Sequence, residues 1–311
     1  MPVRGGRAAG GRLEADQPVL VLLNNVHCAD PSSLKLVHYL ARGIRGKRVL
    51  LVVWFFWDMR GHLREGQRWL EAALGLPVTD DARTARPWAL NAAGWLALGQ
   101  HASYGPAIAI LEEARAAARA VDDERALVRA NAFLGLTLAI GTREHIRAEE
   151  ILEQSVAGGR AGGDSWALAL ALYGQGHAAL VQGDAERVQE RWQTCAAVAQ
   201  GVGNLYGLSY LEFRWGVLAL MKLELERANG CLRESLRLSA ELDSIREMAV
   251  AIAALVLVGG AAGRPERAAR LAGGVQALLQ RAGCDLPAFL VGEYERGVTG
   301  LREHIGVQLF E

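Results

Sequence analysis

Cysteine is scarce in this sequence, and neither sign of charge prevails. The four cysteines, Cys28, Cys195, Cys231 and Cys284, are widely spaced and form no CxxC pair. This spacing excludes the disulfide framework that is typical of small secreted domains. We therefore expect reduced thiols in a cytoplasmic protein. The chain has 34 basic and 34 acidic residues. Because no basic surplus is present to displace counterions, direct nucleic-acid binding is not expected.

Long apolar runs are also missing. The first one, Val19–Leu23, is too short for the hydrophobic region of a signal peptide. The longest charge-free apolar stretch spans 248–263, which is short of the roughly 20 residues that a membrane-spanning helix needs. We interpret this stretch as a buried helix and expect no membrane contact.

The motifs of common enzymes are lacking too. The sequence contains no HExxH and no GxSxG, so neither a zincin metal site nor a hydrolase nucleophile is indicated. The His, Cys and Asp within 27–30 lie close together, but a tetrahedral metal site needs a fourth ligand. The nearest approach to a phosphate-binding loop, at 6–13, has Arg12 and Leu13 where a lysine and a hydroxyl residue are required. We expect no catalytic residues, no metal and no cofactor.

A repeat is the strongest signal that the sequence does contain. Pairs of residues four positions apart, a smaller one followed by a larger one, recur at a step of 40 or 41 residues. The pairs are Gly66/Leu70, Ala107/Leu111, Ala148/Leu152, Val188/Trp192, Ala228/Leu232 and, with a weaker second member, Ala268/Ala272. A repeated unit of this length predicts an array in which each unit packs on its neighbours.

Glycine recurs in the same frame. Gly94, Gly135, Gly176 and Gly216 keep the step of 40 or 41 residues, and Val256 takes the next position. Glycine in a helix interior costs about 1 kcal/mol relative to alanine. Its return at one position of the repeat therefore indicates that a neighbouring helix crosses closely there.

Each period is typical of two helices joined by a polar or glycine-containing turn. The first helix carries the glycine, as in 168–181, and the second has apolar residues at helical spacing, such as Val188, Trp192 and Cys195. We predict an all-α, tetratricopeptide-like helical-repeat solenoid of about six helix pairs over 54–306. The step is longer than the 34 residues usual for tetratricopeptide repeats, so a HEAT-like array is the structural alternative.

The segment before the repeats has a different pattern. Residues 1–17 are rich in Gly, Ala and Arg without periodicity and predict a disordered leader. Next, 18–26 indicates a buried strand, 31–44 a helix and 48–53 a second strand. This strand–helix–strand segment, 18–53, is too short to bury a core of its own.

Both ends of the array resemble one family. The runs are WFFWDMRGHLREG at 54–66 and GRPERAARL at 263–271. They resemble the first and last repeats of the tetratricopeptide arrays in bacterial LuxR-type and AfsR-like signalling ATPases, which regulate transcription. The resemblance covers 54–300. It implies the sensor or interaction part of a signalling or transcriptional regulator.

The N-terminal segment resembles the same family. The run VLVLLNNVHCADPSS at 19–33 is similar to its Walker B strand, which ends in two acidic residues followed by His-aromatic-Ala-Asp-Pro. In the family the acidic pair holds Mg²⁺ and orients the attacking water, but Asn24 and Asn25 stand at those positions here. An amide is a weaker ligand for a hard cation than a carboxylate, and it is no base. The resemblance therefore implies that 18–53 is a vestigial ATPase fragment with a degenerate Walker B motif.

Function is then expected on the concave surface of the solenoid, which the first helices of such arrays line. The glycine register places these candidates near that surface: Trp88, Asn91, Trp95, Arg129, Tyr173, His177, Tyr210, Phe213 and Arg214. Aromatic and arginine side chains are common interface anchors. We predict a non-catalytic module that binds a protein or peptide partner. Two alternatives stay open, a sensor of a small-molecule effector and a nucleotide-dependent switch that is the remnant of an ATP-dependent transcriptional regulator.

A first prediction concerns nucleotide. The purified protein should not hydrolyse ATP or bind Mg·ATP tightly, because Asn24 and Asn25 replace the acidic pair and no phosphate-binding loop precedes them. Isothermal titration calorimetry with Mg·ATP measures this directly. A dissociation constant in the low micromolar range would contradict the expectation.

Overall fold

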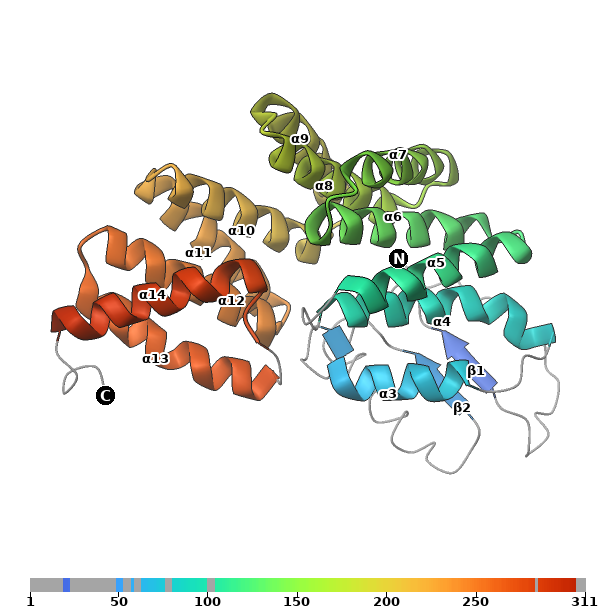
Figure 1. Ribbon diagram of the computed structural model, residues 1–311, viewed down its shortest axis with the longest axis horizontal. Coiled ribbons are helices and arrows are strands. Elements are labelled where there is room, and N and C mark those ends of the chain that lie inside the picture. The colour runs from blue at the N-terminus through green and yellow to red at the C-terminus, as the bar shows by residue number, and fades with distance from the viewer. Residues whose placement is uncertain are drawn as a thin grey trace.

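The computed structural model describes residues 19–22, 49–52, 57–58, 63–75, 80–99, 104–282 and 285–305. Helix dominates these ranges. The helices are α3 (Leu63–Leu74), α4 (Asp80–Gly99), α5 (Tyr104–Ala120), α6 (Glu124–Gly141), α7 (His145–Gly162), α8 (Ser165–Gln182), α9 (Ala185–Gly201), α10 (Leu205–Met221), α11 (Leu225–Glu241), α12 (Ile245–Ala261), α13 (Pro265–Ala282) and α14 (Ala288–Ile305). Each even-numbered helix from α4 to α12 packs on the helix that follows it, and Figure 1 shows these hairpins stacked into a curved array. The predicted helical-repeat solenoid is confirmed.

Two short strands precede the array. Strand β1 (Val19–Leu22) pairs in parallel with β2 (Val49–Val52), and both lie inside the predicted strands. A parallel pair needs a crossover connection between its strands. The predicted crossover helix at 31–44 falls outside the described residues, as do the leader 1–17 and the pair Asn24 and Asn25. In the array, β1 lies against α4 and β2 against α3.

The turns repeat as regularly as the helices. Between α8 and α9, Gly183 adopts the left-handed conformation with a φ of +76°. Asp184 then starts α9 by accepting a hydrogen bond from the backbone N–H of Arg187 at 3.0 Å. Asp164 and Asn204 cap α8 and α10 in the same way. A left-handed residue followed by an Asp or Asn cap ends one helix and starts the next at once, which fixes the tight reversal of the chain.

The periodic glycines receive the large side chains of the second helices. A Cβ atom added to any of the four would lie within 2.6 Å of a side chain on the following helix. The contacts are Gly94 with Leu111, Gly135 with Leu152, Gly176 with Trp192, and Gly216 with Leu232. These large residues are the second members of the periodic pairs. The expected close helix crossing is confirmed, and the two periodic markers are the two sides of one contact.

The last hairpin reverses this arrangement. Val256 of α12 stands where the glycine is expected, and Ala272 of α13 stands where the large residue is expected. Both are buried in one apolar cluster with Ala268 and Leu301. Volume lost on the second helix is therefore regained on the first, as close packing requires.

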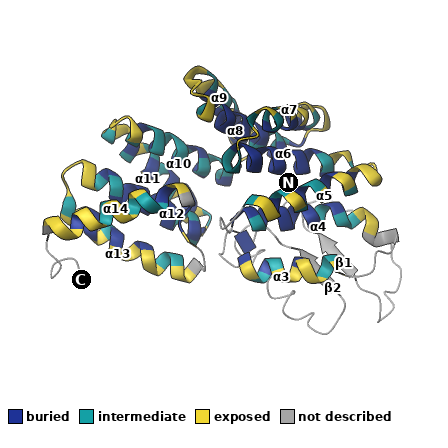
Figure 2. Cartoon of the chain, viewed as in Figure 1, coloured by how far each residue is buried: buried dark blue, intermediate teal, exposed yellow. Residues whose placement is uncertain are grey.

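The first helices of the hairpins form the inner layer of the array. Residues 128–139 of α6 and 171–179 of α8 are buried without interruption, because each helix packs against both its own hairpin partner and the adjacent hairpins. Figure 2 shows that exposed residues concentrate on second helices such as α7 and α9. The inner layer is thus where side chains from distant repeats can meet.

The apolar stretch 248–263 falls largely in α12, most of whose residues are buried. This agrees with its interpretation as a core helix. Within the part of the chain that the structure describes, none of the helices is long and apolar enough to cross a membrane.

Exchanging a periodic glycine should be costly. Gly176→Ala places a methyl group against the indole of Trp192, and overpacking of this kind typically costs about 1–3 kcal/mol of stability. Gly230→Ala is the matched control, since this exposed glycine lies inside α11 with open space around it. It should gain about 0.5–1 kcal/mol from helix propensity. Denaturant melts followed by circular dichroism compare the two, and equal midpoints would show that the crossing is not tight.

Candidate binding site on the inner face

The nine candidate residues all lie on first helices. Trp88, Asn91 and Trp95 are on α4, Arg129 on α6, Tyr173 and His177 on α8, and Tyr210, Phe213 and Arg214 on α10. Trp88, Tyr210 and Arg214 are half-buried, and the other six are buried. We call the side of these helices that carries the candidates the inner face.

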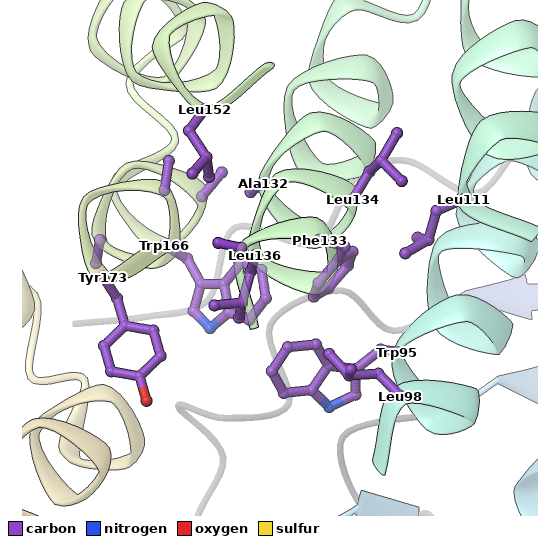
Figure 3. Packing of buried hydrophobic residues seen from close by; sticks show 14 of the residues in the cluster. Trp95, Leu98, Leu111, Ala132, Phe133, Leu134, Leu136, Leu152, Trp166 and Tyr173 are labelled. Carbon is purple, nitrogen blue, oxygen red and sulfur yellow. The ribbon is translucent and has the colours of Figure 1, made fainter. Parts of the chain in front are cut away.

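Several candidates are fixed by packing between neighbouring repeats. The ring of Trp95 lies 4.9 Å from that of Phe133, and Phe133 lies 5.3 Å from Trp166. Figure 3 shows these rings together, contributed by α4, α6 and α8. Edge-to-face and tilted ring pairs of this kind stabilise a core beyond the area they bury. The row therefore joins three repeats. Trp166 was missed by the sequence analysis, although it lies one repeat before Tyr206 in the periodic frame.

Arg129 is held by an ion pair and two indoles. Its Nε donates to Asp164 Oδ2 at 2.8 Å, and its guanidinium lies 5.2 Å from the Trp88 ring and 5.3 Å from the Trp166 ring. Burial by itself raises the pKa of Asp164. The hydrogen bond and charge of Arg129, with the Ala167 N–H and Arg125, outweigh burial and lower that pKa below its usual 3.8. Arg129 therefore links α6 to the N-terminus of α8.

A second polar group joins opposite ends of the array. Asp58, which is only 2% exposed, accepts hydrogen bonds from Trp95 Nε1 at 2.9 Å and from the Tyr206 hydroxyl at 2.5 Å. Arg246 Nη1 donates to its other carboxylate oxygen at 3.3 Å. These donors come from α4, α10 and α12. The inner faces of helices far apart in the sequence therefore face one shared space.

The partners of Asp58 extend into a network. Tyr206 and Tyr210 have their hydroxyls 3.2 Å apart, and the Tyr210 hydroxyl donates to Glu247 Oε1 at 3.0 Å. Arg246 Nη1 also lies 3.2 Å from Glu247 Oε1. We call these five residues the closing network, because it connects the first described residues of the array to its later hairpins.

Electrostatics keeps the closing network in a donor state. Burial, reinforced by nearby carboxylates, raises the pKa of Tyr206 and of Tyr210 well above the usual value, so both phenols stay protonated. Burial alone would lower the pKa of Arg246, but Tyr210, Glu247 and Asp58 raise it well above its usual value. Burial likewise raises the pKa of Glu247, against the opposing charge of Arg246. The network therefore presents hydroxyl, indole and guanidinium hydrogens to a carboxylate.

Arg214 forms a third cluster with aromatic residues. Its Nε donates to the Tyr173 hydroxyl at 2.9 Å, and its guanidinium lies 4.4 Å from the ring of Phe289 on α14. Phe289 is 46% exposed. The His177 ring lies 4.9 Å from that of Tyr173, and its buried Nε2 has no hydrogen-bond partner. Burial, helped by the charge of Arg214, lowers the pKa of His177 well below 6.5, so this imidazole is neutral.

The described residues offer little for catalysis or metal binding. They hold no group of three or more His, Cys, Asp or Glu side chains placed to bind a metal ion. Burial raises the pKa of Cys195 to about 12, so its thiol is a poor nucleophile. An open depression of about 650 Å³ lies at the turns that precede α11 and α13, away from all nine candidates. The inner face is thus suited to binding anionic and aromatic groups.

Comparison with known proteins supports the fold. No protein-family model matches the sequence, and no curated protein matches it significantly. Among solved structures, the chain is similar to a Rap protein crystallised in complex with Competence and Sporulation Factor. The TM-score is 0.58 at 12% identity, over 87% of this chain and 81% of that one. At this identity the likeness concerns the fold alone, and it establishes a tetratricopeptide-like helical repeat.

The ion pair at Asp164 should make stability depend on pH. Because the pKa of Asp164 is lowered on folding, its contribution is present above about pH 4 and is lost as the pH falls through the folded value. Removing one partner of a buried pair costs about 3 kcal/mol. Asp164→Asn should therefore be destabilised by about this amount near pH 7, and its melting temperature should approach that of the wild type toward pH 2.

Asp184→Asn provides the control for this measurement. Asp184 caps α9 as Asp164 caps α8, but it is exposed and forms no buried ion pair in the described structure. Its substitution should change stability by less than about 0.5 kcal/mol at any pH. If the Asp164→Asn deficit were constant from about pH 7 to about pH 2, the ion pair would not be its cause.

Proposed function

We propose that this chain is a non-catalytic module that binds a protein or peptide partner on its inner face. The observation that carries the proposal is the exposed aromatic–arginine pair of Phe289 and Arg214, beside the half-buried Tyr210. Tyrosine and arginine are enriched among residues that dominate binding energy. An aromatic ring stacked on a guanidinium offers a partner both an apolar surface and hydrogen-bond donors.

The outer layer has a different character, which supports this assignment. Arg237 of α11 is exposed and bonds to Glu234 and Glu241 of its own helix. Arg227 bonds to Glu224 in the same manner. Exposed pairs of this kind are worth little and keep a surface solvated. The Rap protein with a similar fold also holds a factor in its crystal structure, which is consistent with a partner-binding role for such an array.

The setting of the module is a further part of the proposal. The resemblance of 54–300 and of 19–33 to LuxR-type signalling ATPases supports a role as the sensor part of a cytoplasmic signalling or transcriptional regulator, with the ATPase function lost. A small-molecule effector is the second candidate. The buried, unpartnered Nε2 of His177 favours it, because a ligand atom could complete the hydrogen bonding of this imidazole.

Selection of peptides tests the main proposal. A displayed random peptide library is selected on the immobilised full-length protein, and enriched sequences are synthesised and titrated by fluorescence anisotropy. Arg214→Ala and Phe289→Ala should each weaken binding about 30-fold, which corresponds to about 2 kcal/mol. Arg237→Ala, an exposed arginine of the outer layer, should change affinity less than about twofold.

Stability must be measured on the same variants. Arg214→Ala and Phe289→Ala should melt within a few degrees of the wild type, since both side chains lie partly in solvent. A library that yields no peptide dependent on Arg214 or Phe289 would contradict binding at this face. Binding lost in Arg237→Ala but kept in Arg214→Ala would move the site to the outer layer.

A further inference from the structure

Asp58 reaches much farther along the chain than the other contacts of the inner face. Its hydrogen-bond partners Tyr206 and Arg246 are separated from it by 148 and 188 positions. In the periodic frame, Asp58 lies one step of 41 before Gly99 and thus belongs to the first repeat. One carboxylate of the first repeat is therefore received by a site built mainly from later repeats.

We propose that Trp95, Tyr206 and Arg246 form a carboxylate-binding site that Asp58 occupies in the free protein, and that an acidic side chain of a bound peptide replaces it. This inference deepens the proposed function and depends on peptide binding at the inner face. It names the chemical class of the partner, an acidic peptide, and assigns Asp58 the role of an internal competitor.

The donor set of the site selects for a carboxylate. An indole N–H, a phenol O–H and a guanidinium N–H converge on its two oxygens. Hydrogen bonds to an ionised acceptor are roughly twice as strong as neutral ones. Because the pKa of Tyr206 is raised by burial, its hydroxyl remains a donor at neutral pH. A ligand that brings an amide at this position offers a neutral oxygen and a second group that can only donate.

Exchange of one carboxylate for another is close to balanced in energy. Displacing Asp58 removes an acceptor from three buried donors, and an acidic ligand restores it. A ligand without the carboxylate leaves this loss uncompensated, and sites built for hydrogen bonding reject such analogues strongly. Meanwhile Glu247 lies 3.2 Å from Arg246 Nη1, so the guanidinium keeps a counter-charge while the exchange proceeds.

Trp57 anchors the internal competitor from behind. This side chain is 7% exposed and lies so close to Gly66 of α3 that a Cβ there would be 2.6 Å from its ring. Trp57 therefore stays seated when the Asp58 carboxylate leaves the site. The displaced acid remains beside the site at high local concentration, which weakens every competing ligand and makes the affinity of the free protein for acidic peptides low.

The test uses the full-length chain and a matched pair of peptides. The probe is a fluorescein-labelled, amidated peptide with the sequence of 57–65, WDMRGHLRE, and its twin carries Asp58→Asn. Both are titrated by fluorescence anisotropy into wild type, Asp58→Asn and the control Asp184→Asn. The control changes an exposed aspartate of the α9 cap to the same residue.

The proposal expects a specific pattern of affinities. Asp58→Asn should bind the WDMRGHLRE peptide at least about tenfold more tightly than wild type or Asp184→Asn does, and at least about tenfold more tightly than it binds the twin. Adding Tyr206→Phe to Asp58→Asn should reduce the preference for the acidic peptide several-fold, because one of the three donors is then missing.

Three results would overturn the carboxylate site. Asp58→Asn that binds both peptides equally, or neither, shows that the site does not accept a carboxylate in trans. Asp58→Asn that has lost its cooperative melting shows that Asp58 is a permanent structural contact and not a replaceable occupant. If library-selected peptides still bind in an Arg214-dependent manner, the proposed function stands and only this inference fails.

Discussion

The contact between a glycine of each first helix and a large side chain of the following helix is the constraint on which the array depends. In four successive hairpins the large residue occupies the space that a Cβ atom would need. Such a contact brings the two helix backbones together and fixes their relative position along both axes. Because the hairpins share this geometry, they stack with nearly the same rotation each time, and a regular curve results.

Curvature of this kind decides which side chains meet on the inner face. Neighbouring repeats meet through the ring row from Trp95 to Trp166, and distant repeats meet through Asp58 and Arg246. Buried charges and phenols are costly unless they are fully paired. The closing network therefore restricts the array to those curvatures at which its carboxylates and donors reach each other. A flexible superhelix is narrowed to one shape by a few polar atoms.

The sequence reveals the repeat because its signals are local. Helix pairs, turns and the close glycine crossing all depend on residues within one step of 40 or 41, and all are present in the structure. The register also placed the nine candidates on first helices. Trp166 and Arg246 occupy the same frame as Tyr206 and could have been added from it. The role of Asp58 could not be inferred, because it follows from the total curvature over several hairpins, to which each crossing angle adds a little. Phe289 was equally hidden, since α14 lies beyond the last copy of the repeat.

The exchanged volumes of Val256 and Ala272 give the last hairpin an identity of its own. In an array of similar units, one hairpin could in principle dock in the place of another, displaced by a whole unit. If α13 docked on α10, Ala272 would face Gly216 and leave a void, whereas α11 docked on α12 would drive Leu232 into Val256. Both mistakes are penalised, by lost contacts in one case and by overlap in the other. The reversed pair thus acts as an address label that tells the folding chain which unit comes last.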